Sequence, residues 1–308
     1  MISILIPVKD FDIVALVESM KRGLGSTPEY GEIIIGDDGS SAEFRARYLA
    51  LSGEKVKVVV SETNIGRAAI RNRLISEAKG DQMLIIDADA MVPGTPEAYL
   101  QAWLPFISKA SVISGGIIYR EVPPGDPDLL LRWQYGRKRE QKKAAERNKD
   151  PYGTFTTFNV LIDKQVFSRL RFNEELKQYG HEDTLFGYQL KKAGIKILHI
   201  DNGLLHEGLE TNMDFLSKTR FSIENLSRLY DIVTDKKTFS DSVRMLRLYR
   251  IVKLLGITGI LAGIYIRYKD RMERRLDSSS VSLRLFNYYR ISMFSAFRKM
   301  HLKNTRAI

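Results

Sequence analysis

The sequence predicts an α/β fold with a mostly parallel central sheet flanked by helices, followed by a C-terminal helical extension. Three observations lead to this prediction. Strand-like and helix-like segments alternate over residues 1–120, a pattern typical of a parallel sheet covered by helices. The first strand-like segment is a continuous apolar run, as expected when both faces of a sheet are buried. From Asn212 onward the chain shows only helical patterns.

The predicted elements follow one another closely in the first half of the chain. Strands are expected at 2–8, 32–36, 56–60, 82–86 and 111–119. Helices are expected between them at 14–20, 41–51, 68–78 and 96–107. Further along, strand patterns recur at 155–162 and 195–200. A helix is expected over 182–193, which Gly194 closes, since glycine commonly ends helices.

Composition places the chain among ordinary globular proteins. It has 308 residues, of which 44% are hydrophobic and 28% charged. The absence of cysteine excludes disulfides, thiolate metal sites and thiol nucleophiles. The net charge of +11 has a local origin: residues 241–308 carry 15 Lys or Arg and 4 Asp or Glu, so the rest of the chain is neutral. This asymmetry predicts an anionic partner for the C-terminal part.

Acidic and polar residues follow four of the predicted strands. In chain order these stretches are Pro7-Val8-Lys9-Asp10, Asp37-Asp38-Gly39-Ser40, Glu62-Thr63-Asn64-Ile65-Gly66-Arg67 and Asp87-Ala88-Asp89. Ligands of open α/β sheets bind beyond the carboxyl ends of the strands, so these side chains are candidates for a binding site. Taken singly, Asp87-Ala88-Asp89 is also compatible with an acidic turn, and Asp37-Asp38-Gly39-Ser40 with a tight turn. Asp87 and Asp89 together suit a hard divalent cation, which prefers oxygen ligands.

These segments, together with two later ones, resemble the motifs of family 2 glycosyltransferases with a GT-A fold. The segments that carry the resemblance are Ile4-Leu5-Ile6-Pro7-Val8, Asp37-Asp38-Gly39-Ser40, Asn64 to Asn72, Asp87-Ala88-Asp89, Gly180-His181-Glu182-Asp183 and Leu205-His206-Glu207. They cover about residues 1–210 and leave the tail uncovered. The resemblance implies a GT-A catalytic domain at 1–211, with a nucleotide-sugar half at 1–120 and an acceptor half at 121–211. A basic helical extension then occupies 212–308.

The resemblance also implies a set of nucleotide-binding residues. The set is Pro7, Val8, Asp37, Asp38, Asn64, Arg71, Asp87 and Ala88. Pro7 and Val8 are expected to line the base, and Asp38 or its neighbour Asp37 to accept a hydrogen bond from it. Arg71 is expected to lie under the base and to pair with the aspartate of that turn. Asp87 is expected to face the ribose.

The remaining implied roles concern the metal and the acceptor. Asp89 and His206 are expected to bind Mn²⁺ or Mg²⁺. Asp183 is the expected general base, which takes the proton from the acceptor hydroxyl. Glu182, His181 and Phe158 are expected to bind the acceptor. For Glu182-Asp183 the sequence is also compatible with simple stabilisation of a helix N-terminus.

Together these features predict a metal-dependent inverting glycosyltransferase. It would move a sugar from a nucleoside diphosphate, with UDP expected, to a hydroxyl of a glycan or lipid-linked acceptor. One alternative is a transferase that makes a polyprenyl-phosphate sugar, which needs no general base. A nucleotidyltransferase is disfavoured, because no glycine-rich loop follows the first strand. A protein that binds nucleotide sugar or membrane without turnover is the non-enzymatic alternative.

The basic tail predicts contact with an anionic membrane surface. Arg244, Arg247, Arg250 and Lys253 recur every three residues among apolar ones, a pattern typical of interfacial helices. The apolar run at 254–266 is too short to span a bilayer. A cytoplasmic enzyme at the inner face of the cell membrane is therefore expected. A helical cap on the catalytic domain and a homodimer interface are the alternatives, and no nucleic-acid partner is expected.

Overall fold

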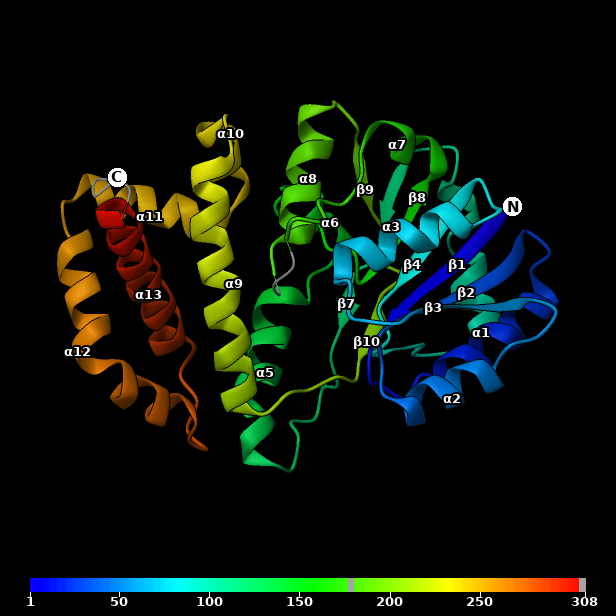
Figure 1. The fold of residues 1–308 in the computed structure, drawn as a ribbon, viewed down its shortest axis with the longest axis horizontal. Coiled ribbons are helices and arrows are strands. Elements are labelled where there is room, and N and C mark those ends of the chain that lie inside the picture. The colour runs from blue at the N-terminus through cyan, green and yellow to red at the C-terminus, as the bar shows by residue number, and fades with distance from the viewer. Residues whose placement is uncertain (177–179, 305–308) are drawn as a thin grey trace. The chain divides into compact units, whose positions relative to one another are not determined.

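The computed structural model describes residues 1–176 and 180–304 (Figure 1). The chain divides into two compact units. Unit 1 comprises Met1–Tyr119, Glu140–Lys177 and Glu182–Gly208. Unit 2 comprises Arg120–Arg139, Gln178–His181 and Leu209–Ile308, and so contains the whole predicted helical extension.

The larger sheet of unit 1 has seven strands in the order β3-β2-β1-β4-β8-β6-β9. Their bounds are β1 (Ile2–Val8), β2 (Tyr30–Asp38), β3 (Val56–Ser61), β4 (Gln82–Ile86), β6 (Val112–Ser114), β8 (Asn159–Asp163) and β9 (Ile197–His199). Strands β1 to β4 pair in parallel, as do β6 and β9. Strand β8 is antiparallel to both of its neighbours, β4 and β6. The sheet is therefore mostly parallel, as the sequence predicts.

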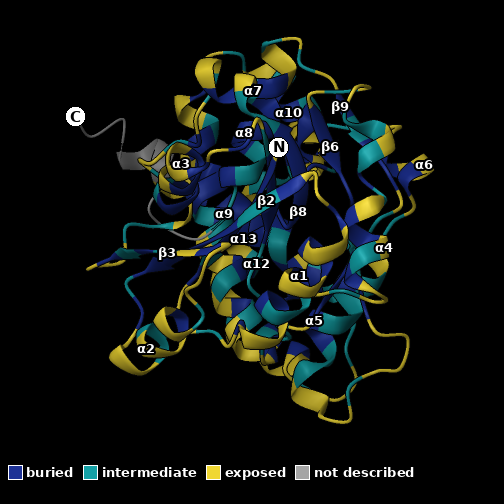
Figure 2. Ribbon diagram, turned by 90° about the vertical axis from the view of Figure 1, so that its right-hand side faces the viewer, coloured by how far each residue is buried: buried dark blue, intermediate teal, exposed yellow. Residues whose placement is uncertain are grey.

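Helices cover both faces of this sheet. Those of unit 1 are α1 (Val14–Ser26), α2 (Ala42–Ala50), α3 (Arg67–Glu77), α4 (Pro96–Gln101), η1 (Leu104–Phe106), α6 (Ala144–Arg147), α7 (Lys164–Arg169) and α8 (Glu182–Lys192). Ile4 and Ile6 of β1 join the core under α1 and α4, whereas Leu5 joins the core under α3, α7 and α8. The strands are accordingly coloured mainly as buried in Figure 2. Because both faces of the sheet are buried, β1 is apolar at nearly every position.

A second, three-stranded sheet in unit 1 has the order β5-β10-β7. Its strands are β5 (Ala90–Met91), β10 (Leu204–His206) and β7 (Ile117–Ile118). Strand β10 is antiparallel to β5 and parallel to β7. Through these short pairings, residues near 90 and near 206 become neighbours.

Three predicted elements differ from the observed ones. The strand expected at 111–119 is two strands in different sheets, because the chain turns at Gly115 and Gly116, the latter with φ of 94°. The helix expected at 96–107 ends as α4 and continues as the 3₁₀ turn η1, since Pro105 has no amide hydrogen to extend it. The strand expected at 155–162 begins only at Asn159, because Thr157 uses its amide hydrogen elsewhere.

Unit 2 is helical. Its helices are η2 (Pro127–Leu129), α5 (Leu130–Tyr135), α9 (Asn212–Ile232), α10 (Lys236–Ser242), α11 (Arg244–Leu254), α12 (Thr258–Leu276) and α13 (Leu283–Asn304), and a π-helical segment, η3 (Gly136–Glu140), follows α5. The inner face of α13 includes Tyr289 and Phe294, both fully buried. Among the described residues no single helix has the length and hydropathy of a bilayer span. The pair α11 and α12 meets that test together but bends by 113°.

Candidate active site

Several candidate nucleotide-binding residues lie at the carboxyl ends of adjacent parallel strands or directly after them. Val8 of β1 lies opposite Asp37 of β2, and Asp38 lies opposite Ser61 of β3. Asp87 follows β4, which pairs with the other side of β1. The sheet register therefore brings the polar stretches after four strands to one edge, as predicted. Of the two residues expected to line the base, Val8 is buried in the core, whereas Pro7 is partly exposed.

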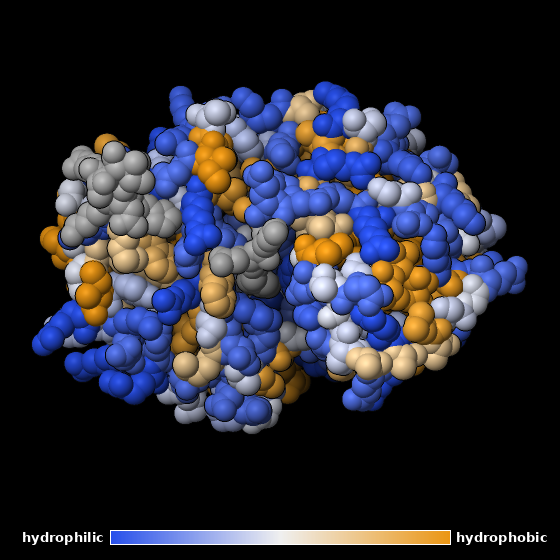
Figure 3. All heavy atoms as spheres, in the orientation of Figure 1, coloured by the Kyte–Doolittle hydropathy of each residue, from blue (hydrophilic) through white to orange (hydrophobic). Residues whose placement is uncertain are grey.

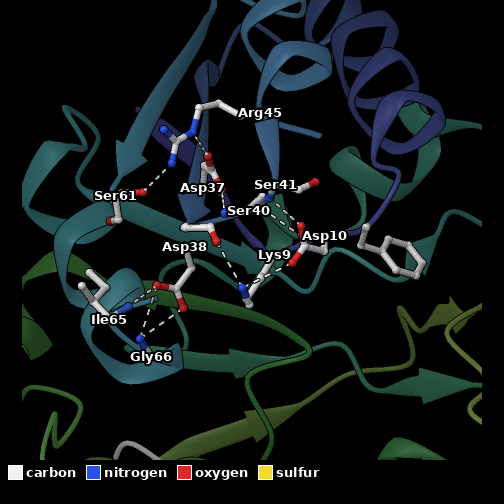
Figure 4. Close-up of polar contacts among 12 residues, drawn as sticks. Lys9, Asp10, Asp37, Asp38, Ser40, Ser41, Arg45, Ser61, Ile65 and Gly66 are labelled. Atoms are coloured by element: carbon white, nitrogen blue, oxygen red, sulfur yellow. Dashed lines mark hydrogen bonds and ion pairs between the residues drawn. The ribbon is translucent and has the colours of Figure 1, made fainter. Parts of the chain in front are cut away.

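The two aspartates of the β2 turn have different surroundings (Figure 4). The side chain of Asp37 is fully buried, and its oxygens accept from the Ser40 amide at 2.8 Å and from Arg45 Nε at 3.1 Å. Asp37 thus stabilises the turn. Gly39 has φ of 71°, a conformation that favours glycine.

Asp38, the second aspartate of this turn, contacts the start of α3. Its carboxylate accepts from the amides of Ile65 at 2.7 Å and Gly66 at 3.2 Å, where α3 begins. Burial raises its pKa against the effect of those two amides and of Lys9 nearby. Lys9, which the sequence prediction left without a role, donates from Nζ to the Gly39 carbonyl at 3.1 Å. Asn64 lies exposed just before Ile65.

Arg71 does not pair with the aspartates of the β2 turn, so that expectation was wrong. Its Nη2 lies 2.8 Å from Asp87 Oδ1, and its Nη1 lies 3.6 Å from Glu182 Oε1. The reason is geometric, because amides at the start of α3 already satisfy Asp38, and Arg71 lies one turn further along the helix. Although burial opposes ionisation of Asp87, Arg71 and Arg67 lower its pKa. Arg71 is only 2% exposed, so it forms a buried link between β4 and α8.

Asp89 and His206 lie together, as the sequence predicts. His206 pairs with Ala90 across β10 and β5, and its Nε2 lies 3.4 Å from Asp89 Oδ2. The imidazole ring stacks between Tyr119 and Phe158, with ring centroids 5.2 and 5.4 Å away. These two rings fix the plane of the imidazole.

The Asp89–His206 pair fits part of a divalent-metal site. Two ligands of one octahedral ion at about 2.1 Å each lie about 3 Å apart when they are at right angles. The observed 3.4 Å is close to this separation. In the described part of the chain, no group of three or more His, Cys, Asp or Glu residues could hold a metal. Among the described residues, Asp89 and His206 are thus two candidate ligands, a number that would suit a metal whose other ligands are substrate phosphates and water. Ala88, between the two aspartates, is partly exposed.

Asp183 is held at the start of α8 by two threonines. Thr157 donates from its hydroxyl to Oδ1 at 2.7 Å and from its amide to Oδ2 at 3.1 Å, and Thr156 Oγ1 lies 3.2 Å from Oδ2. Burial, and then the negative charge of Glu182, raise the pKa of Asp183. A positioned carboxylate with a raised pKa has the character of a general base. This anchoring was not predicted. The two threonines lie just before β8 (Asn159–Asp163), where the sequence predicts a continuous strand.

Two residues expected to bind the acceptor have other surroundings. Phe158 is 3% exposed and stacks on His206, so its ring face is not available for a sugar. That expectation is corrected: Phe158 orients the imidazole. His181 has φ of 71°, rare for a residue other than glycine, and immediately precedes Glu182 in the chain. Its acceptor role, like that of Glu182, stays a prediction.

The sheet order, the parallel strand ends and this cluster of acidic groups define a protein of the GT-A fold class. Residues 3–170 match the family described as glycosyl transferase family 2. This match covers more than half of the chain, and the protein belongs to glycosyl transferase family 2.

Individual relatives are distant. The chain is 27% identical over 192 residues to the amylovoran biosynthesis glycosyltransferase AmsB of Erwinia amylovora, and the match covers 60% of this chain and 62% of that protein. The match thus spans less than two thirds of the length of AmsB. Mannosyltransferase PcManGT from Pyrobaculum calidifontis, solved with GDP-Man and Mn²⁺, is 12% identical with a TM-score of 0.57, over 97% of this chain and 86% of that one. TarS of S. aureus is 15% identical with a TM-score of 0.50, over 97% and 55%. These structural likenesses concern the fold.

Proposed function

We propose that this protein is a metal-dependent inverting glycosyltransferase. It transfers a sugar from a nucleoside diphosphate, with UDP as the expected nucleotide, to a hydroxyl group of a glycan or lipid-linked acceptor. The name of the AmsB relative, which refers to amylovoran biosynthesis, supports a glycan product.

The observation that carries this proposal is the ion-pair link through Arg71. Its guanidinium contacts Asp87, which follows the nucleotide-side strand β4, at 2.8 Å, and Glu182, which opens α8, at 3.6 Å. Asp183 follows Glu182 directly. The groups proposed for the donor and the carboxylate proposed as the base therefore belong to one connected cluster in unit 1. Such a cluster is what a single displacement at a sugar carbon requires.

Each group has a defined task in the proposed reaction. Asp38 and Asp87 bind the base and the ribose, and Asp89 and His206 hold the metal. When bound, that metal neutralises the charge that develops on the diphosphate leaving group. Asp183 removes the proton from the acceptor hydroxyl as its oxygen bonds to the anomeric carbon. The bond from that carbon to the diphosphate breaks on the opposite face, so the configuration inverts.

The anchoring of Asp183 favours this reaction over the alternatives. An acceptor that is already a phosphate anion, as in polyprenyl-phosphate glycosylation, has no proton to lose. Three hydrogen bonds hold the Asp183 carboxylate while burial raises its pKa. A protein that only bound nucleotide sugar would gain nothing from this arrangement.

Thermal unfolding tests the donor site. We expect UDP with Mn²⁺ to stabilise the wild type, by about 2.7 kcal/mol at a concentration 100 times its dissociation constant. Asp89→Ala should abolish this stabilisation because it removes one of the two metal ligands. Asp81→Ala is the matched control, since Asp81 belongs to the same unit and its carboxylate is highly exposed, 3.5 Å from the N-terminal amino group.

Comparing different nucleotides in this experiment identifies the nucleotide of the donor. Stabilisation by GDP with Mn²⁺ but not by UDP would replace UDP by a guanine nucleotide, the class bound to PcManGT. An equal shift in Asp89→Ala and in wild type would refute the proposed metal ligand. No shift with any nucleoside diphosphate would refute the proposed function.

A further inference from the structure

Helices α11 and α12 in unit 2 expose large aliphatic side chains on their outer faces. We call this set the α11–α12 patch; it consists of Leu248, Ile251, Leu254, Leu255, Ile260 and Ile266. Leu254 is 87% exposed and Ile266 71% exposed. The inner faces of both helices are apolar as well, and pack within unit 2 through residues such as Tyr249 and Tyr265. A surface helix normally has a polar outer face, so the patch requires an explanation.

Every charged residue within the stretch of chain that carries the patch is basic. Between Asp241 and Asp270 the chain has no acidic residue, and it has six basic ones: Arg244, Arg247, Arg250, Lys253, Arg267 and Lys269. Arg250 pairs with Asp241 at the edge of this stretch. Within the described residues, Arg244 and Lys253 are exposed and form no ion pair. Figure 3 shows hydrophobic and strongly hydrophilic side chains next to one another where Figure 1 draws α12.

The charge identifies the class of partner. Pairing two copies of the patch would bring two sets of cations together, which disfavours a second copy of this chain. Stacking on nucleic-acid bases needs several exposed aromatic rings, whereas α11 and α12 expose six large aliphatic side chains and one ring, that of Tyr268. An anionic lipid bilayer supplies both an apolar interior for the leucines and isoleucines and negative headgroups for the cations.

We propose that the α11–α12 patch inserts into the interface of an anionic lipid bilayer. The bend of 113° between the helices, at the turn containing Gly256 with φ of 71°, suits a segment that lies in the membrane surface. The leucines at that turn enter the acyl region, and the arginines and lysine remain at the headgroups. A lipid-linked acceptor would then share its membrane surface with the enzyme.

Co-sedimentation of the full chain with vesicles tests the apolar contribution. The vesicles are phosphatidylcholine, with or without phosphatidylglycerol. We expect binding only when phosphatidylglycerol is present, and a loss of affinity of about tenfold or more in Leu254→Ser/Leu255→Ser. Both leucines are exposed, so the substitution leaves the core unchanged. Ile232→Ser is the matched control, because Ile232 is 70% exposed in the same unit but lies outside the patch.

A second variant tests the charge contribution. Arg244→Gln/Lys253→Gln should weaken binding by about fivefold for each charge removed. Lys237→Gln, an exposed control without an ion pair among the described residues, should bind like the wild type. Raising the salt concentration should mimic the double variant. Failure to bind phosphatidylglycerol vesicles, or binding that the leucine variant leaves unchanged, would overturn the proposal. So would a wild-type dimer in sedimentation velocity that the leucine variant dissociates.

Discussion

Replacing Asp183 with asparagine removes the proposed base and keeps its shape. An amide oxygen at the Oδ2 position still accepts from the Thr157 amide, 3.1 Å away, and from the Thr156 hydroxyl. The amide nitrogen at the Oδ1 position donates to the Thr157 hydroxyl, 2.7 Å away, which turns to accept. All three contacts persist, so changes in rate report on the chemistry rather than on a collapsed site.

The expected loss in kcat is about 10²- to 10⁴-fold, the usual contribution of a general base. The assay is the initial rate of nucleoside diphosphate release at saturating donor, in the presence of an acceptor. Donor binding, followed by thermal unfolding with nucleotide and Mn²⁺, should be unchanged. Asp81→Asn is the matched control, because Asp81 is highly exposed in the same unit.

The same variant should be more stable than wild type at neutral pH. Burial and Glu182 raise the pKa of Asp183 in the folded protein. A carboxyl group whose folded pKa exceeds its unfolded pKa favours folding at low pH, and this contribution disappears as pH rises through the folded pKa. The ionised form thus destabilises the wild type at neutral pH, and the neutral amide avoids that cost. The difference in melting temperature should shrink as the pH is lowered.

Two results would refute this reasoning. A kcat for Asp183→Asn within about tenfold of the wild type would exclude Asp183 as the base, since general bases contribute more than that. A melting temperature below that of wild type at neutral pH would show that the folded protein favours the charged carboxylate. The raised pKa would then be wrong.

Three further outcomes follow from individual contacts. Thr157→Val removes a hydrogen bond to the charged Asp183, so the acid limb of the kcat–pH profile should move to higher pH. Arg71→Met removes the buried cation beside Asp87 and Glu182, of which Glu182 keeps only the more exposed Arg67, so it should lower the free energy of unfolding in urea by about 3–5 kcal/mol at neutral pH. Gly39→Ala requires a positive φ and brings Cβ within 2.4 Å of backbone, so it should cost at least about 1–2 kcal/mol. Gly53→Ala, where a Cβ meets nothing within 4 Å, is its control and should unfold much like the wild type.

Local sequence patterns were enough to predict the strands of the larger sheet's parallel half. β1 (Ile2–Val8) and β4 (Gln82–Ile86) match the predicted bounds, because uninterrupted apolar runs of this length can be buried only inside a sheet or a core. The predicted strand at 111–119 failed because two glycines let the chain leave one sheet for another. The hydrophobic periodicity of a segment does not indicate which sheet that segment joins.

The sequence predicted one pair of neighbouring side chains, Asp89 and His206, and missed the partners of other residues. Asp89 and His206 were expected together, and the pairing of β5 with β10 places them 3.4 Å apart. The partner predicted for Arg71 was wrong. Its observed partners, Asp87 and Glu182, come from segments after β4 and at the start of α8, which only the tertiary structure brings to Arg71. Thr157 was missed as an anchor of Asp183, since the two residues lie 26 positions apart in the chain and meet only in the tertiary structure.

The sequence by itself determined the alternation of strands and helices, the polar residues at the strand ends and the basic character of the tail. Each depends on residue type and short-range spacing, which hydrophobic burial and backbone geometry translate directly into local structure. Only the tertiary structure decided that Asp37 supports its own turn while Asp38 contacts the start of α3, that Arg71 joins Asp87 to Glu182, and which apolar residues of α11 and α12 remain exposed. These outcomes depend on contacts between segments far apart in the chain, and such contacts arise when the helices pack.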